Sequence, residues 1–218
     1  MRINKYFIAF VALCFTIACN KEPDFNYPEG TVGRSKITNF PVLTLQGDKV
    51  IVLEKGTAFT DPGATAKEGT NDLTPTVSGQ VDTNTPGVYT LTYSAVNKDG
   101  FSASTTRTVV VYETDDTAGS HDLSGNYART TNGSVAEWTK LAPGVYSVFN
   151  PGGAPGTNLT VIVFNPTGYT IFIPEQVSSD GSITSSSNET YTPGSPAKYS
   201  WKIVNPGYGT ALRTFVKQ

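Results

Sequence analysis

The chain contains little cysteine and histidine, and this scarcity excludes several kinds of chemical site. Its 218 residues include two cysteines and one histidine, His121. One histidine excludes metal sites built from several histidines and disfavours a Ser-His-Asp arrangement. Cys14 lies in an N-terminal apolar segment that we expect to be removed, which leaves Cys19 as the remaining cysteine. The sequence therefore predicts no disulfide framework, no metal site and no cofactor.

Charged residues are also scarce. Lys, Arg, Asp and Glu make up 16% of the chain, with a net charge of −2. If Arg2 and Lys5 leave with the N-terminal segment, the 16 basic residues fall to 14 against 18 acidic ones, a net charge of about −4. Nucleic-acid binding uses a basic patch, and anionic lipid headgroups attract basic segments. We therefore expect no nucleic-acid partner and no electrostatic docking on lipid.

Long stretches of helical periodicity are absent as well. The chain has 21 glycines and 14 prolines. They separate short apolar runs that are rich in β-branched residues, which is the pattern of strands and turns. This composition predicts an all-β exported protein.

The first residues form an export signal. Arg2 and Lys5 precede an apolar run over 6–18, which matches a signal-peptide core and is shorter than the ~20 residues of a membrane-spanning helix. The run ends Ala18-Cys19, and a small residue directly before a cysteine resembles the lipobox of bacterial lipoproteins. The resemblance implies a signal peptide at 1–18, cleavage before Cys19, and lipid on Cys19. The alternative is an ordinary secretory signal with an incidental cysteine.

The residues after Cys19 carry a second resemblance. Lys21-Glu22 is similar to the surface-export signal of Bacteroidota-type lipoproteins. This similarity implies an outer-membrane protein that is anchored by lipid and faces the cell exterior. Residues 19–40 are polar and contain prolines and glycines, so we predict a lipidated flexible tether over 19–40.

Residues 41–112 form the first predicted domain. Residues 87–95 alternate apolar and polar side chains, as in a half-buried strand. Residues 97–100 predict a hairpin loop, and 101–112 predict a second long strand. Together with shorter runs nearer the start of the domain, this pattern indicates a small β-sandwich.

Three segments of this domain carry a family resemblance. They are EKGTAFTDPGA at 54–64, VDTNTPGVY at 81–89 and TTRTVVV at 105–111. They resemble the bacterial Ig-like surface domain, in the style of hyalin-repeat and cadherin-like modules. The resemblance implies a spacer or adhesion module without catalytic residues.

Residues 113–122 predict a polar linker that contains several acids. The simplest interpretation is that these acids are solvated, and an alternative is calcium bound between two domains. A third interpretation concerns Asp116-Thr117-Ala118, which resembles the O-glycosylation motif of Bacteroidota-type exported proteins. That resemblance makes Thr117 a candidate modification site.

Residues 123–218 form the second predicted domain, an antiparallel β-meander that is either a sandwich or a partly closed barrel. Segments 125–127, 140–146 and 199–203 resemble C-terminal domains of uncharacterised Bacteroidota lipoproteins, which often occur near genes for outer-membrane glycan uptake. The predicted strands lie at 125–130, 144–149, 159–164, 169–173, 199–204 and 211–217. The Ser-rich stretch 178–188 is predicted to be a long loop.

The second domain offers no recognisable pair of catalytic carboxylates. Its acids from Leu123 onward are Glu137, Glu175, Asp180 and Glu189. Glycoside hydrolysis needs two carboxyl groups facing one another across the substrate. Glu137 beside Trp138 is the best single candidate, whereas Asp180-Gly181 indicates a turn. We therefore predict that the protein is not an enzyme.

Aromatic residues are the other candidate ligand-binding groups. Exposed rings can stack on the apolar face of a sugar, so Trp138 and Trp201 are candidate binding residues. Most aromatic side chains of a small β domain instead pack in its core. Trp201 shares a strand face with Tyr199 and Ile203, which favours the core for Trp201. The sequence leaves Trp138 open.

Three functions follow from these observations. The first is a non-enzymatic cell-surface lipoprotein that binds an extracellular glycan through 123–218 and uses the Ig-like domain as a spacer. The second is a structural or accessory subunit of an outer-membrane nutrient-uptake complex. The third is a glycoside hydrolase, for which Glu137 is the candidate.

Overall fold

The computed structural model describes residues 28–32 and 35–218, and it divides the chain into two compact units between Asn39 and Phe40. The predicted signal peptide and Cys19 lie outside the described residues. In the first unit, β1 (Thr31–Val32) pairs antiparallel with β2 (Ser35–Lys36), so part of the predicted tether forms a short hairpin. Among the described residues, no helix has the length and apolar character needed to cross a membrane.

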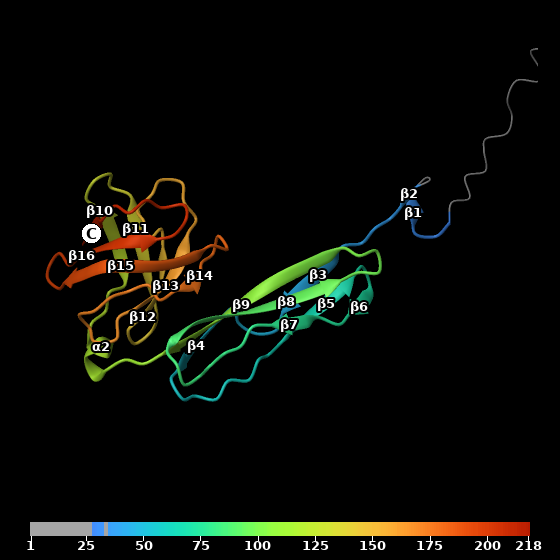
Figure 1. Ribbon diagram of the computed structural model, residues 1–218, viewed down its shortest axis with the longest axis horizontal. Coiled ribbons are helices and arrows are strands. Elements are labelled where there is room, and N and C mark those ends of the chain that lie inside the picture. Colours follow the sequence, from blue (N-terminus) through green and yellow to red (C-terminus); the bar gives the residue numbers. More distant parts are fainter. Residues whose placement is uncertain (1–27, 33–34) are drawn as a thin grey trace, which may run out of the picture. The chain divides into compact units, whose positions relative to one another are not determined.

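The first domain of the second unit is a sandwich of two sheets (Figure 1). One sheet has the order β3-β5-β6 and the other the order β4-β9-β8-β7. All neighbours are antiparallel except the parallel pair β4 and β9. The strands are β3 (Pro41–Leu45), β4 (Val50–Glu54), β5 (Ala64–Glu68), β6 (Asn71–Leu73), β7 (Thr76–Ser78), β8 (Gly87–Val96) and β9 (Ser102–Tyr112). The predicted β-sandwich is confirmed.

The long hairpin of β8 and β9 follows from the alternation in the sequence. Leu91, Tyr93 and Ala95 are buried, and Leu91 and Tyr93 pack with Val109 in the core of the sandwich. The loop between the strands is held by the Asn97 side chain, whose oxygen accepts hydrogen bonds from the backbone N–H of Asp99 and Phe101. The predicted hairpin at 97–100 is therefore confirmed.

Arg107 on β9 ties the loops of this domain together. Its side chain is fully buried and donates to the Asp61 carboxylate and to the backbone oxygens of Asp48 and Gly63. Burial opposes the charge on Asp61, but hydrogen bonds from Tyr93 and Gly63 and the Arg107 charge outweigh it and lower the Asp61 pKa. Burial, together with the bond to Asp61, raises the pKa of Tyr93 to about 12.

The second domain is a nearly closed antiparallel barrel. Its eight strands follow one another around the sheet in the order β13-β12-β11-β10-β17-β16-β15-β14, so the first and last strands of the domain, β10 and β17, pair. The strands are β10 (Gly125–Arg129), β11 (Val135–Ala142), β12 (Val145–Phe149), β13 (Thr160–Phe164), β14 (Gln176–Val177), β15 (Ile183–Thr192), β16 (Lys198–Val204) and β17 (Arg213–Lys217). The predicted all-β meander with partial closure is confirmed.

Residues 171–176 bridge the open side of this sheet. Phe172 and Phe164 exchange backbone hydrogen bonds, and the Gln176 side chain bonds both backbone groups of Ile162 on β13. On the other side, Ile173 exchanges hydrogen bonds with Ser186 on β15. The buried Gln176 amide thus replaces strand pairing across the gap. Residues 169–173, which were predicted to be a strand, form only this bridge.

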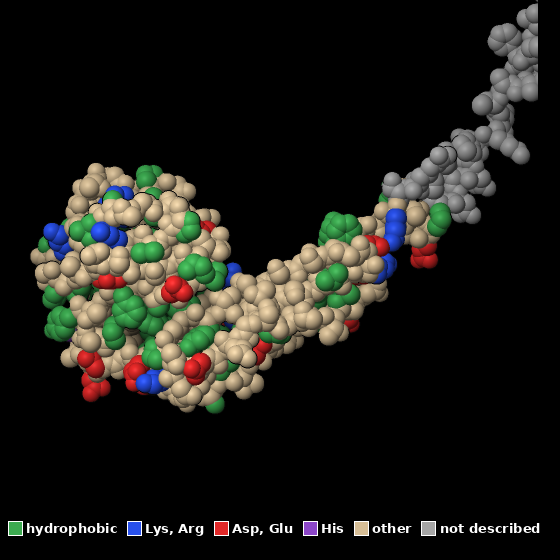
Figure 2. Space-filling model, viewed as in Figure 1, with side chains coloured by type: hydrophobic (Ala, Val, Ile, Leu, Met, Phe, Trp, Pro, Cys, Tyr) green, Lys and Arg blue, Asp and Glu red, His purple; other side chains and the backbone are tan. Residues whose placement is uncertain are grey.

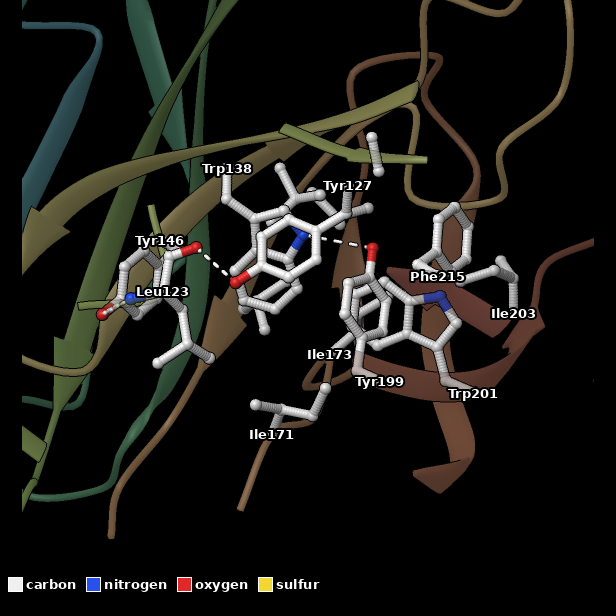
Figure 3. Packing of buried hydrophobic residues seen from close by; sticks show 14 of the residues in the cluster. Leu123, Tyr127, Trp138, Tyr146, Ile171, Ile173, Tyr199, Trp201, Ile203 and Phe215 are labelled. Atoms are coloured by element: carbon white, nitrogen blue, oxygen red, sulfur yellow. Dashed lines mark hydrogen bonds between the residues drawn. The ribbon is translucent and has the colours of Figure 1, made fainter. Parts of the chain in front are cut away.

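An aromatic core fills the barrel (Figure 3). Trp138 and Trp201 stack with ring centroids 5.7 Å apart. Tyr199 contacts both tryptophans and stacks on Phe215. Alternation along β11, β16 and β17 directs these rings to one side of the sheet, and the interlocked rings define a single well-ordered core.

The predicted linker forms structure. Within 113–122, α2 (Asp116–Ser120) begins at Asp115, whose side chain accepts from the Ala118 N–H. Ala118 is fully buried, and the Tyr146 hydroxyl donates to the backbone oxygen of His121. The segment therefore belongs to the folded second domain.

A cluster of buried residues joins the two domains. Val110 of β9 is fully buried with Val145, Ile162 and Phe164 of the barrel. Half-buried residues of both domains pack around the cluster: Val52, Val88, Tyr112, Ala142 and Phe172. Residues 40–218 accordingly form one compact unit.

Candidate ligand-binding groove

The two tryptophans predicted as ligand-binding residues lie in the barrel core. Trp138 is 2% exposed and Trp201 is 0% exposed. Their ring N–H groups donate to the Tyr199 hydroxyl and to the Pro151 backbone oxygen, at 3.1 and 2.8 Å. Stacking on a sugar requires an exposed ring face, and neither tryptophan has one. The role of Trp138 and Trp201 is therefore to pack the core, as the alternative in the sequence analysis holds.

A groove of about 540 Å³ lies on the outer side of β15 and β16 in the second domain. We call it the groove. Its walls come from the two strands, from Glu175 and from the loop after β16. The lining residues are Glu175, Ile183, Ser185, Ser187, Asn188, Lys202, Ile203, Val204, Asn205, Pro206, Tyr208 and Thr210.

Strand alternation places these side chains in the groove. On β16, Trp201 and Ile203 are buried, whereas Lys202 is half-buried and Val204 is 51% exposed. On β15, Thr184 is fully buried and its neighbours Ile183 and Ser185 line the groove. The same strands thus build the core with one face and the groove with the other.

An irregularity in β15 shapes the floor of the groove. The register with β16 shifts between Ser187 and Thr190. Asn188 lies within this bulge with a φ of 56°, a backbone conformation that asparagine tolerates better than most residues. A bulge redirects the side chains beside it, and Ser187 and Asn188 both line the groove.

The loop after β16 forms a firmly held wall. The Asn205 amide donates to the hydroxyls of Ser182 and Thr184, and its oxygen accepts from the Gly207 N–H. The Tyr208 hydroxyl is 3.0 Å from the Thr157 hydroxyl. The Arg213 guanidinium lies 5.2 Å from the centre of the Tyr208 ring. These contacts pre-form the wall, so a ligand would not have to order it.

The groove offers hydrogen-bonding groups of every kind. Hydroxyls and amides both donate and accept, whereas Lys202 donates and ionised Glu175 accepts. Neither Glu175 nor Lys202 forms an ion pair with another described residue. Both charges are therefore available to a ligand.

The carboxylates do not form a hydrolase site in the groove. Glu175 is the one carboxylate among the lining residues, whereas glycoside hydrolysis needs two. Asp180 holds a turn, where bonds from Ser182 and Ser178 lower its pKa against the effect of burial. Glu137 is exposed on β11, away from the lining residues.

Thr117 is exposed on α2, and its hydroxyl lies within bonding distance of the Asp115 carboxylate and the Thr167 backbone oxygen. Its O-glycosylation stays a prediction. Within the described part of the chain, no three His, Cys, Asp or Glu side chains are grouped to hold a metal ion.

Sequence reasoning missed the groove because it treated the Ser-rich stretch as a loop. That prediction was wrong: Ile183–Thr192 is the strand β15. Small polar residues occupy both faces of this strand, so the apolar alternation that signals a strand is missing. The one sequence signal for β15 was indirect. The buried aromatic residues that alternate along β16 indicate a strand inside a sheet, and such a strand pairs with a neighbour on each side.

Comparison with known proteins identifies the first domain. Residues 43–111 match the family described as bacterial surface protein, Ig-like domain. This segment is a bacterial surface Ig-like domain. Among solved structures, the lipoprotein BT2262 from Bacteroides thetaiotaomicron is 27% identical, with a TM-score of 0.40 over 82% of this chain and 100% of that chain. No curated protein matches the chain. The Ig-like domain spans β4 to β9 and most of β3, as the sequence resemblance predicted.

Proposed function

We propose that the protein is a non-enzymatic surface lipoprotein that binds an extracellular glycan in the groove. The Ig-like domain would act as a spacer between the lipid anchor and the groove. The observation that carries this proposal is the groove itself, which combines preformed walls with many hydroxyl and amide groups.

The groove chemistry suits a sugar. Each sugar hydroxyl both donates and accepts hydrogen bonds, as do Ser185, Ser187 and Asn188. Ile183 and Val204 add apolar surface for the C–H groups of a sugar ring. The volume of about 540 Å³ lies within the usual ~300–1,000 Å³ of small-ligand sites.

Binding to a glycan array tests this proposal. We expect a specific glycan to bind residues 40–218, and the change Lys202→Ala to weaken that binding. Lys198→Ala is the matched control, because Lys198 lies on the same face of β16 but outside the groove. Equal effects of the two changes, or no binding on the array, would count against the groove as a glycan site.

Anchoring through lipid on Cys19 is the second part of the proposal. It is supported by the residues around the cysteine and by the bacterial surface Ig-like domain that follows. Acyl chains stabilise membrane binding by about 0.8 kcal/mol for each buried methylene. We expect Cys19→Ala to release the protein from the outer-membrane fraction. A Cys19→Ala protein that still fractionates with membranes would contradict the anchor.

The accessory role in an outer-membrane uptake complex is a second candidate. Exposed aliphatic side chains favour it: Ile183 is 53% exposed and Val204 is 51% exposed. A patch of this kind on a surface protein can bind another protein. If this role holds, Ile183→Asp should abolish chemical cross-linking to a membrane partner in intact cells, and unchanged cross-linking would contradict it.

A further inference from the structure

An exposed apolar surface lies at the start of the Ig-like domain. Phe40 is 60% exposed and Phe101 is 44% exposed, and their rings meet edge to face with centroids 4.9 Å apart. We call Phe40 and Phe101 the apolar tip. Figure 2 shows hydrophobic side chains at the end of the domain where the β8–β9 hairpin of Figure 1 turns.

The backbone holds the tip in place. Phe40 directly precedes β3, and Val42 faces outward on that strand while Leu43 and Leu45 pack toward the core. Phe101 ends the hairpin loop, where its N–H donates to the Asn97 side chain at 2.8 Å. Two phenylalanine rings held on the surface bury little area within the domain. Burying both rings together against another surface would remove more apolar area from water and so lower the free energy.

The position of the tip in the chain indicates what that surface is. Cys19, the predicted lipid site, precedes Phe40 by 40 − 19 = 21 residues. A chain of this length spans at most ~75 Å even when fully extended, so an anchor at Cys19 would keep the tip close to the membrane and make the contact intramolecular. A contact that is too weak to hold the free protein at a membrane would therefore form when the protein is anchored there.

The charges beside the tip favour an apolar contact. Lys67 pairs with Asp72 at 3.2 Å, and Lys98 lies 3.8 Å from Glu68. Because these lysines are balanced by acids, electrostatic attraction to a charged partner is small. The tip thus fits the interface of a membrane, where apolar side chains such as Phe insert at the boundary between headgroups and acyl chains.

We propose that the apolar tip inserts into the lipid surface to which Cys19 is anchored. This contact would fix the orientation of the Ig-like domain at the membrane. This proposal rests on the lipid anchor of the proposed function. The partner is a lipid surface, and the contact should be insensitive to salt.

Fluorescence quenching on vesicles tests the tip. Residues 19–218 contain one cysteine, Cys19, so that thiol can be coupled to a maleimide phospholipid in phosphatidylcholine vesicles. In the variant Phe101→Trp, we expect brominated acyl chains to reduce the added emission at low and high salt. The control is Phe149→Trp, at a similarly exposed position of the barrel outside the groove, whose emission should not change. Trp138 and Trp201 are buried and give the same background in both variants.

Three results would overturn the proposal. One is emission of Phe101→Trp that is the same with and without bromine. Another is quenching that persists when Phe40→Ser is added, because the tip would then not be the contact. A blue shift of Phe101→Trp that depends on protein concentration without vesicles would instead assign the tip to a second copy of the chain, which also overturns the lipid contact. Coupling supplies the anchor chemically, so these outcomes are independent of the Cys19→Ala test.

Discussion

At the scale of the residue, Trp138 and Trp201 show what strand parity can predict. Trp201 shares parity with Tyr199 and Ile203, and this pattern placed it in the core, where it is fully buried. The burial of Trp138 could not be predicted because no strand was predicted around it. Once β11 is known, Ala136 and Trp138 share its inward face, at 0% and 2% exposure. Parity therefore decides burial only where the strand itself is recognised.

The first prediction concerns Trp138. Replacing Trp138 with Ala removes ring contacts to four aromatic neighbours and the hydrogen bond to Tyr199. We expect the free energy of unfolding to fall by about 3–5 kcal/mol, measured by urea denaturation. The control Leu141→Ala lies on the same strand at 37% exposure and should cost well under half of that. A loss for Trp138→Ala no larger than for Leu141→Ala would contradict the packing described here.

The second prediction concerns Asp61 and pH. The Asp61 pKa is lower in the folded protein than its usual 3.8. Asp61 therefore stabilises the fold above pH 3.8, and this contribution disappears as the pH falls from 3.8 through the lower folded pKa. Asp61→Asn should flatten the loss of stability in that window relative to the wild type, as measured by thermal unfolding at a series of pH values.

The same substitution should also cost stability at neutral pH, because Arg107 would remain buried without its carboxylate. Breaking a buried pair costs up to about 3–5 kcal/mol, and less is expected here because the Asp61 side chain is 27% exposed. A parallel pH profile for wild type and Asp61→Asn would contradict the assigned role of Asp61.

At the scale of the element, turns and hairpins were predictable and polar strands were not. Asn97-Lys98-Asp99-Gly100 forms the predicted hairpin loop for two reasons. The asparagine side chain accepts hydrogen bonds from the loop backbone, and the glycine adopts a positive φ. β15 was missed because Ser and Thr fill both of its faces. The helix α2 was missed because five residues are too few for a helical period, and its stability comes from the buried Ala118 and the Asp115 cap.

The third prediction concerns Gly144, in the turn between β11 and β12. It has a φ of 69°, and an added Cβ would lie 2.4 Å from the Asn165 oxygen and 2.6 Å from the Thr114 side chain. We expect Gly144→Ala to lower the melting temperature much more than Gly156→Ala. Gly156 is the matched control, since its φ is 72° and no atom lies within 4 Å of its added Cβ. Equal effects would mean that backbone conformation alone matters and that the close approach of Thr114 is not formed.

At the scale of the whole molecule, the sequence predicted two β domains but not how they are joined. A polar linker was predicted between them, and Val110 is buried with Val145, Ile162 and Phe164. These four apolar residues could equally well pack in the cores of their own domains. Nothing in the sequence therefore assigned them to a junction between the domains. The groove could not be predicted either, because it depends on the pairing of β15 with β16.

The fourth prediction follows from this junction. A fragment of residues 123–218 loses α2 and uncovers Val145, Ile162 and Phe164. We expect it to unfold at lower urea concentration than residues 40–218 and to aggregate more readily. In the intact unit, Val110→Ala should lower the stability modestly as a milder version of the same change. A fragment as stable as the 40–218 unit would contradict the shared cluster.

The central claim is that the groove binds a glycan, and blocking the groove tests it most directly. Ser185 is half-buried on the outer face of β15 and lines the groove, so Ser185→Trp should fill the groove without entering the barrel core. The measurement is glycan-array binding of residues 40–218 and of this variant, with unfolding curves to show that both are folded. We expect a glycan to bind the wild type and its binding to be lost in Ser185→Trp with little change in stability. Undiminished binding by the folded variant would contradict the central claim.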